Sequence, residues 1–206
     1  MRPARLRHNV RGFTLVELMV ASMVAGIIFT AVATLASTLG AVNDAANDMA
    51  VKQAQLRYAS IRISELIRHC KLICGTPGGD VAVWRADDNG DGQININELV
   101  YIEKGAGSNY LRLCVFPLSD TSPVNLSDVE TLATGAYSVM YVSMIPQCSD
   151  VSFQFDAAPP RSQLVSISFN LVENEIARRY QISATLRGWS GYLLNEAGDA
   201  IASDDD

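Results

Sequence analysis

The sequence predicts an α+β fold in which one long N-terminal α-helix packs on an antiparallel β-sheet. Three observations predict it. The thirty residues from Phe13 to Val42 are almost wholly apolar, and an amphipathic pattern continues the helix through residues 43–74. Short β-prone runs separated by turn residues then occupy residues 75–202. The first half of the helix is long enough to span a membrane, whereas the second half has one apolar face to bury.

The first twelve residues form a basic leader, residues 1–12, that ends at Gly12. This leader carries four arginines and no acid, in a chain of 206 residues with 16 basic and 22 acidic side chains. Removal of the leader leaves 12 basic and 22 acidic residues, which is a net charge of −10 instead of −6. So acidic a body argues against broad electrostatic binding of nucleic acid, and we expect no nucleic-acid partner.

The apolar run of residues 13–42 reads as a membrane anchor. It exceeds the roughly 20 apolar residues that cross a bilayer, and it contains no proline. By the positive-inside rule, the leader stays in the cytoplasm and the rest of the chain is exported across the membrane. One acid, Glu17, interrupts the run five residues after Gly12. A carboxylate near the start of a membrane-spanning helix is costly and is therefore usually functional.

The stretch Gly12-Phe13-Thr14-Leu15-Val16-Glu17 resembles the processing site of type IV prepilins and type II secretion pseudopilins. The resemblance covers the leader, the cleavage site and the anchor. It implies that a prepilin peptidase cuts between Gly12 and Phe13 and N-methylates Phe13, which leaves the anchor on the mature protein. It also implies that Glu17 neutralises the terminal amine of an adjacent pilin subunit during assembly. The alternative is an ordinary signal anchor with an accidental acid.

An amphipathic stripe predicts that the helix continues over residues 43–74. Met49, Leu56, Ile63 and Cys70 recur every seven residues, as expected of one buried helix face. The glycine- and proline-rich residues 75–79 then stop the helix.

The four cysteines are Cys70, Cys74, Cys114 and Cys148. An even number in an exported chain favours disulfides, but the sequence does not choose among the three pairings. The alternative is that the cysteines are free buried thiols. Zinc binding is disfavoured, because Cys70 and Cys74 have no second closely spaced pair and His69 is the only histidine after the leader.

Six β-prone runs follow the helix, and the last two alternate apolar and polar residues around a polar turn at residues 173–175, as in a hairpin. The runs are Val81–Arg85, Leu99–Glu103, Tyr110–Phe116, Val151–Phe155, Leu164–Leu171 and Arg179–Arg187. Residues 118–146, which follow Pro117 and include Pro123, read as irregular or as holding a short helix. The acidic tail, residues 203–206, is expected to be solvated and without fixed structure.

Residues 87–98 match the twelve-residue calcium loop of an EF-hand at every liganding position. The predicted Ca²⁺ ligands are Asp87, Asn89, Asp91, the backbone carbonyl of Gln93, Asn95 (directly or through water) and Glu98. The flanks are β-prone, so we expect an EF-hand-like loop between two strands that stabilises structure at extracellular calcium levels. The alternative is an acidic hairpin turn, because Asn-Gly and Asp-Gly favour tight turns.

These features predict a structural protein and no enzyme. His69 beside Cys70 lacks a third catalytic partner, and a histidine at a helix end is favoured by the helix dipole alone. The predicted function is a minor pilin or pseudopilin that is assembled from the inner membrane into a type IV pilus-like filament. One alternative is a membrane-anchored, calcium-dependent binding, adhesion or DNA-uptake module. For DNA uptake, Arg178, Arg179 and Arg187 offer a small basic patch. The other alternative is an exported enzyme on a signal anchor.

Overall fold

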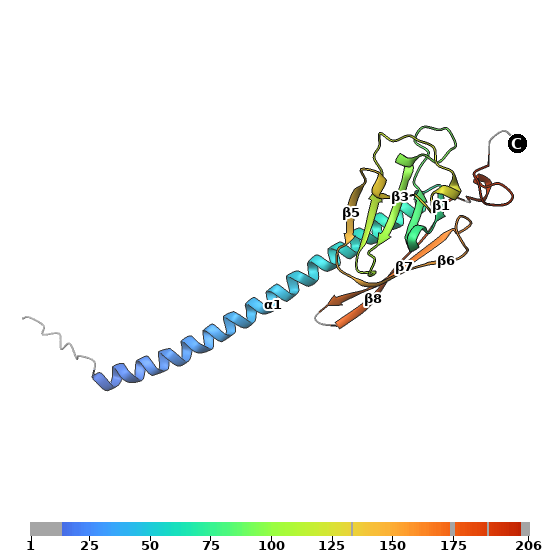
Figure 1. Cartoon of the computed structure of the whole chain (residues 1–206). Coiled ribbons are helices and arrows are strands. Elements are labelled where there is room, and N and C mark those ends of the chain that lie inside the picture. The colour runs from blue at the N-terminus through green and yellow to red at the C-terminus, as the bar shows by residue number, and fades with distance from the viewer. Residues whose placement is uncertain (1–13, 133, 174–175, 189, 203–206) are drawn as a thin grey trace, which may run out of the picture. The chain divides into compact units, whose positions relative to one another are not determined.

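A computed structural model describes residues 14–132, 134–173, 176–188 and 190–202. The processing site at Gly12 and Phe13 and the acidic tail at 203–206 lie outside the described residues. The chain divides into two compact units, Met1–Asp48 and Met49–Asp206. The helix α1 (Leu15–His69) passes through the boundary between them, and all strands belong to the second unit (Figure 1). The predicted α+β fold with a long N-terminal helix is confirmed.

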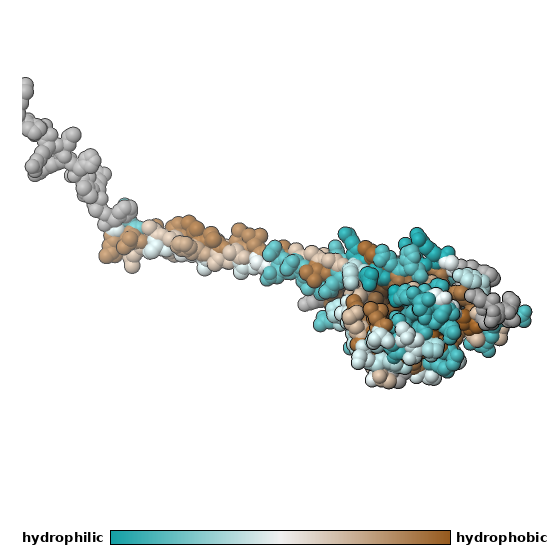
Figure 2. All heavy atoms as spheres, turned by 90° about the horizontal axis from the view of Figure 1, so that it is seen from above, coloured by the Kyte–Doolittle hydropathy of each residue, from teal (hydrophilic) through white to brown (hydrophobic). Residues whose placement is uncertain are grey.

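In the first unit, α1 exposes apolar side chains in every direction. Large hydrophobic residues from Leu15 to Val42 are all exposed, and Figure 2 shows hydrophobic residues dominating the surface of this part of the helix. The hydroxyls of Thr30, Thr34 and Thr38 donate to carbonyls of their own helix at 2.7–2.8 Å, which leaves few unpaired polar groups. Among the described residues α1 is the one helix whose length and composition suffice to cross a membrane.

In the second unit, the last five turns of α1 are amphipathic, as the sequence predicted. Ala59, Ile63 and Ile67 are fully buried in the core, whereas Ile61 and Arg62 are exposed. The helix ends at His69, so the predicted end at residue 74 is wrong. Lys71 donates its backbone N–H to the Trp84 carbonyl at 2.8 Å, and strand pairing therefore replaces the next helical turn.

The strands form two antiparallel sheets, where the sequence predicted one. The five-stranded sheet contains β1 (Leu72–Gly75), β2 (Val81–Trp84), β3 (Leu99–Lys104), β4 (Leu111–Val115) and β5 (Met140–Ile145), in that order. The three-stranded sheet contains β6 (Ser149–Phe155), β7 (Leu164–Glu173) and β8 (Ile176–Thr185), also in chain order. The six predicted runs correspond to β2, β3, β4, β6, β7 and β8, and the predicted β7–β8 hairpin is confirmed with Glu173 opposite Ile176.

Short 3₁₀ helices connect the strands and occupy part of residues 118–146. They are η1 (Pro77–Gly79), η2 (Ile96–Glu98), η3 (Leu126–Asp128), η4 (Thr134–Ala136) and η5 (Ser190–Leu193). The prediction of an irregular stretch with a short helix holds for η3 and η4, but it missed β5.

Two hydrophobic cores lie on opposite faces of the five-stranded sheet, because successive strand side chains alternate between its faces. The first core joins α1 to both sheets through residues such as Ile63, Val83 and Ile167. The second core joins the other face, with Trp84 and Phe116, to Leu126 and Leu194 in the irregular segments. This double burial explains why β2 is apolar at all four positions.

Candidate functional site

Near the N-terminus, Thr14 and Glu17 cap α1. Glu17 Oε2 accepts hydrogen bonds from the Thr14 backbone N–H and from its hydroxyl, both at 2.9 Å, and the Glu17 N–H donates to Thr14 Oγ1 at 3.3 Å. This reciprocal pair is a capping box, which supplies partners for donors at a helix start. This capping role of Glu17 was not predicted from the sequence, although the spacing Thr-x-x-Glu is its signature.

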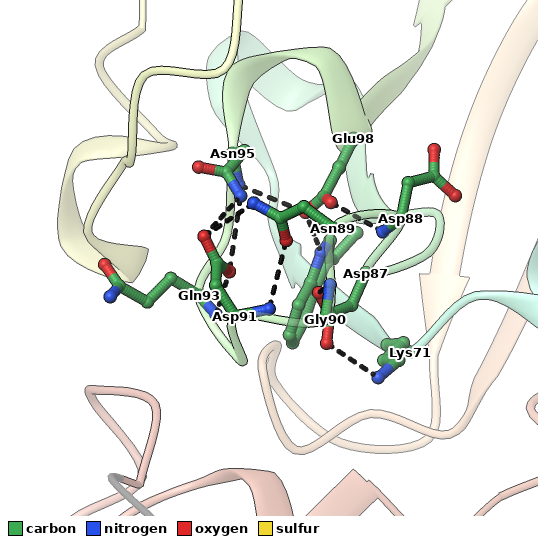
Figure 3. Close-up of polar contacts among 10 residues, drawn as sticks. Lys71, Asp87, Asp88, Asn89, Gly90, Asp91, Gln93, Asn95 and Glu98 are labelled. Atoms are coloured by element: carbon green, nitrogen blue, oxygen red, sulfur yellow. Dashed lines mark hydrogen bonds and ion pairs between the residues drawn. The ribbon is translucent and has the colours of Figure 1, made fainter.

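The predicted calcium loop lies between β2 and β3, as expected. The side chains of Asn89, Asp91 and Asn95 turn toward one another, whereas those of Asp88 and Gln93 point away (Figure 3). Three carboxyl or amide oxygens accept backbone N–H groups two or three residues further along. Asp87 Oδ1 accepts from Gly90 at 2.8 Å, Asn89 Oδ1 from Asp91 at 3.1 Å, and Asp91 Oδ1 from Gln93 at 2.8 Å. These turns fold the loop around its own polar groups. Gly92 has φ +71°, a left-handed conformation that glycine adopts without strain.

Within the loop, the Asp91 carboxylate accepts hydrogen bonds from three different residues. It accepts hydrogen bonds from the side-chain amide of Asn89 at 2.7 Å and from that of Asn95 at 3.2 Å. The backbone N–H of Gln93, followed by the Asn95 side chain, lowers the pKa of Asp91 below its ordinary value. The loop therefore stabilises the negative charge that a bound cation would require.

Glu98, at position 12, lies in the interior and accepts three hydrogen bonds. Its Oε1 accepts from the Asp88 backbone N–H at 2.7 Å, and its Oε2 accepts from the Trp84 indole at 2.9 Å and the Asn95 backbone N–H at 3.3 Å. The side chain thus ties both arms of the loop to β2. In this arrangement Glu98 is a structural acceptor, and its predicted role as a bidentate calcium ligand stays a prediction.

Two basic side chains contact the loop carboxylates. Lys71 Nζ lies 3.3 Å from Asp87 Oδ2, and the Arg85 guanidinium pairs with Asp88. Lys71 precedes Asp87 by sixteen residues, so no local sequence pattern predicted this ion pair.

The donor set fits a hard cation such as Ca²⁺, because it consists of carboxylate, amide and carbonyl oxygens. The predicted ligands Asp87, Asn89, Asp91, Gln93 and Asn95 all belong to the same folded loop. However, no group of three acidic, histidine or cysteine side chains is close enough to share a metal ion within the described parts of the chain. A calcium ion in this loop would therefore need the amide and carbonyl oxygens and a rearrangement of Glu98.

All four cysteines are free thiols in this structure, so the predicted disulfide is not present. Cys70, Cys74 and Cys114 are buried, as in the alternative, whereas Cys148 is half-buried. Cys70 faces the first core, whereas Cys74 and Cys114 face the second, on the other side of the sheet. Burial raises the pKa of Cys70 and of Cys114 to about 12 and that of Cys148 to about 11. A thiol with such a pKa is a poor nucleophile at neutral pH.

The remaining candidate groups offer no catalytic arrangement. His69 is exposed at the end of α1, while Cys70 beside it is buried and donates to the Ile67 carbonyl at 3.2 Å.

The basic patch considered for DNA binding contains arginines that contact other side chains of the protein. Arg178 pairs with Glu173 at 3.4 Å, and Arg179 donates to Ser168 at 3.1 Å. Both guanidinium groups thus have partners within their own sheet.

Comparison with known families identifies one feature. Residues 7–33 match the prokaryotic N-terminal methylation motif, which is characteristic of type IV pilins and pseudopilins. Neither a search of the curated proteins nor a search of the solved structures gives a significant match. The chain thus carries a prepilin-type processing motif that extends into a candidate membrane-spanning helix, and the motif points to a pilin-like structural subunit.

Proposed function

We propose that the chain is a minor pilin or pseudopilin, a structural subunit that is assembled from the inner membrane into a type IV pilus-like filament. The methylation motif at residues 7–33 carries the proposal, because it includes the cleavage site, Glu17 and the start of the anchor. The absence of the mid-anchor proline that is common in major pilins favours a minor subunit. Its partners are a prepilin peptidase, other pilin subunits and the membrane, with the second unit outside the cytoplasm.

Assembly in this proposal relies on the charge of Glu17. Cleavage after Gly12 creates a positively charged amine at Phe13, and a neighbouring subunit offers the Glu17 carboxylate. Pairing these groups removes two unpaired charges from an apolar environment, where each charge is costly. The Thr14 capping box holds the Glu17 carboxylate at the helix start, with two hydrogen bonds that leave its charge in place.

The experiment compares Glu17→Gln with Thr14→Val in cells that assemble the filament. Glutamine at the third helical position still serves a capping box but has no charge, whereas Thr14→Val weakens the cap and keeps the charge. We expect Glu17→Gln to reduce incorporation into filaments at least tenfold, a loss of about 1.4 kcal/mol or more. We expect Thr14→Val to retain most of it.

Intact-mass analysis of both variants controls for processing, because Thr14 and Glu17 lie close to the cleavage site. A mature chain that begins at N-methylated Phe13 is required before incorporation is compared. Equal incorporation of processed Glu17→Gln and unsubstituted protein would refute the charge-pairing mechanism. A chain that keeps its leader, in cells that process other prepilins, would refute the assignment itself.

The proposal includes a structural calcium ion in the loop of residues 87–98. The supporting observations are the full set of oxygen ligands at the expected spacing and the turns that fold the loop around them. Asp87, Asn89 and Asp91 would contribute side-chain oxygens, Gln93 its carbonyl, and Asn95 an oxygen directly or through water. Glu98 joins them when its carboxylate releases the Trp84 indole.

Thermal unfolding of the full chain in detergent tests the ion, with calcium and with a chelator. A calcium concentration about ten times the dissociation constant should stabilise the protein by about 1.4 kcal/mol. Trp84 fluorescence, followed in a Trp189→Phe background, reports whether Glu98 leaves the indole. An unchanged melting temperature together with no calorimetric binding would reduce the loop to a hairpin turn. Magnesium, which demands stricter octahedral geometry, is the control ion.

A further inference from the structure

Lys71 occupies a distinctive place beside the loop of residues 87–98. It lies between the end of α1 and the start of β1, and its backbone N–H is fixed to the Trp84 carbonyl at 2.8 Å. Its ammonium group lies 3.3 Å from Asp87 Oδ2 and 5.4 Å from the centroid of the Trp84 ring (Figure 3). The Asp87 side chain is only 9% exposed, against 39% for Lys71. The contact is therefore shielded from water on the side of the carboxylate.

The carboxylates of the loop are satisfied in three different ways. Asp91 is held by amide and backbone N–H groups, and Glu98 accepts backbone and indole N–H groups. Of the six predicted calcium ligands, Asp87 is the one whose carboxylate contacts a basic side chain within the described residues. Asp87 is also the first ligand in the calcium-loop pattern.

We propose that Lys71 is an intramolecular cation that holds Asp87 when no metal is bound and opposes calcium binding at the same carboxylate. This inference rests on the proposed calcium site. A cation that enters the loop meets a carboxylate already neutralised by a tethered ammonium group, and a divalent ion beside that ammonium is repelled by it. Lys71 therefore weakens calcium binding and keeps the empty loop folded.

The tether also gives the loop a preferred metal-free conformation. The Lys71 backbone is anchored at the junction of α1 and β1, so its side chain needs little ordering to reach Asp87. The aromatic face of Trp84 provides a second favourable site for the ammonium group. Lys71 can then withdraw from Asp87 without becoming an isolated charge.

The test is calorimetric titration of the full chain in detergent with calcium chloride. The variant Lys71→Met should bind calcium about tenfold more tightly than the unsubstituted chain, as expected when a nearby like charge is removed. Lys71→Arg keeps the charge and should bind with nearly unchanged affinity. Lys71→Gln provides a second neutral variant, in case the methionine variant does not fold by circular dichroism.

Lys104→Met is the matched control. Lys104 also places its ammonium group over an aromatic ring, 5.7 Å from the centroid of Phe153, but it stands at the far end of β3 from the loop. The control removes the same charge and a similar ring contact, and calcium affinity should stay unchanged because the distance exceeds the screening length of about 8 Å.

The outcomes separate this inference from the calcium proposal. Equal affinities of Lys71→Met and the unsubstituted chain, with binding lost in Asp87→Asn, would overturn the role of Lys71 and leave the calcium site standing. Binding that is measurable only in the neutral Lys71 variants would support the inference strongly. Absence of binding in every variant at millimolar calcium would overturn both proposals.

Discussion

At the scale of the residue, Glu98 shows how a buried carboxylate organises a loop without help from a basic side chain among the described residues. Its two oxygens accept from Trp84 on β2, from the start of the loop at Asp88 and from its end at Asn95. Hydrogen bonds to a charged acceptor stabilise more than neutral ones, and a buried donor left without a partner is costly. The fold of the loop should therefore depend on Glu98 even in the absence of calcium.

We expect Glu98→Gln to destabilise the protein by about 2–3 kcal/mol in the presence of a chelator. The amide keeps one acceptor oxygen but turns an NH₂ group toward one set of N–H donors. Urea unfolding followed by circular dichroism measures the effect. Asp88→Asn is the control, because only the backbone of Asp88 contacts Glu98, and its cost should stay within about 0.5 kcal/mol. Similar costs for the two variants would contradict the assigned role.

The residues of the candidate site could be assigned to one loop between two strands from the sequence, because their spacing is local. Their role as calcium ligands stays a prediction. The contacts that modify the site could not. Lys71 reaches the loop only after β1 pairs with β2, with Leu72 opposite Trp84. Trp84 meets Glu98 only after β2 pairs with β3, with Trp84 opposite Leu99. That pairing is a tertiary event, and no periodicity in the sequence encodes it. The Thr14–Glu17 box was accessible in principle, since its signature is local.

At the scale of the element, the end of α1 shows tertiary structure overriding a local pattern. Leu72, Ile73 and Cys74 extend the apolar stripe of the helix in the sequence, yet they form β1, which is buried at every position. Strand β1 satisfies its backbone by pairing with β2, and the Arg187 N–H caps the Arg68 carbonyl at 3.1 Å. The central strands were predictable because burial on one or both faces makes them apolar; β5, with Met140 and Tyr141 exposed, gave no such signal.

In the amphipathic part of α1, the same replacement of isoleucine by alanine should have very different effects on stability at two positions. Ile63→Ala removes a fully buried side chain from the first core and should cost about 3 kcal/mol. Ile61→Ala, two residues away on the same helix, removes a side chain that is 52% exposed and should cost no more than about 0.5 kcal/mol. Thermal unfolding of the two variants under identical conditions makes the comparison. Equal costs would show that this stretch of α1 does not pack on the sheets in solution.

At the scale of the whole molecule, the second unit is stabilised by two hydrophobic cores that share the five-stranded sheet. Its cysteines are distributed between these cores and none is cross-linked. The number of cysteines is known from the sequence, but the distances between their sulfur atoms are not, since these distances depend on the order of the strands in the sheets. The predicted export of the chain favoured disulfides. The distribution of the thiols over two faces of the sheet explains why Cys70 has no partner in Cys74.

Alkylation at pH 8 without reductant should distinguish the thiols. Cys148 is only half-buried, so it should react first, and raising the pH toward its pKa of about 11 should accelerate its reaction. Cys70, Cys74 and Cys114 should react only after unfolding. Mass spectrometry should then find four labelled cysteines, and a reductant should leave the melting temperature unchanged. Fewer than four labels in denaturant would reveal a disulfide.

The order of the strands has a consequence for how the chain acquires its structure. Within each sheet, every strand pairs with the strand immediately before or after it in the chain. Such nearest-neighbour pairing needs no strand to wait for a distant one, although the connection from Val115 to Met140 is long. Topologies with local contacts fold faster than those that pair distant segments. A polypeptide that crosses a membrane beginning with its N-terminal part could therefore add one strand at a time to each sheet in turn. Its exposed strand edges would be short-lived, which limits the time available for aggregation.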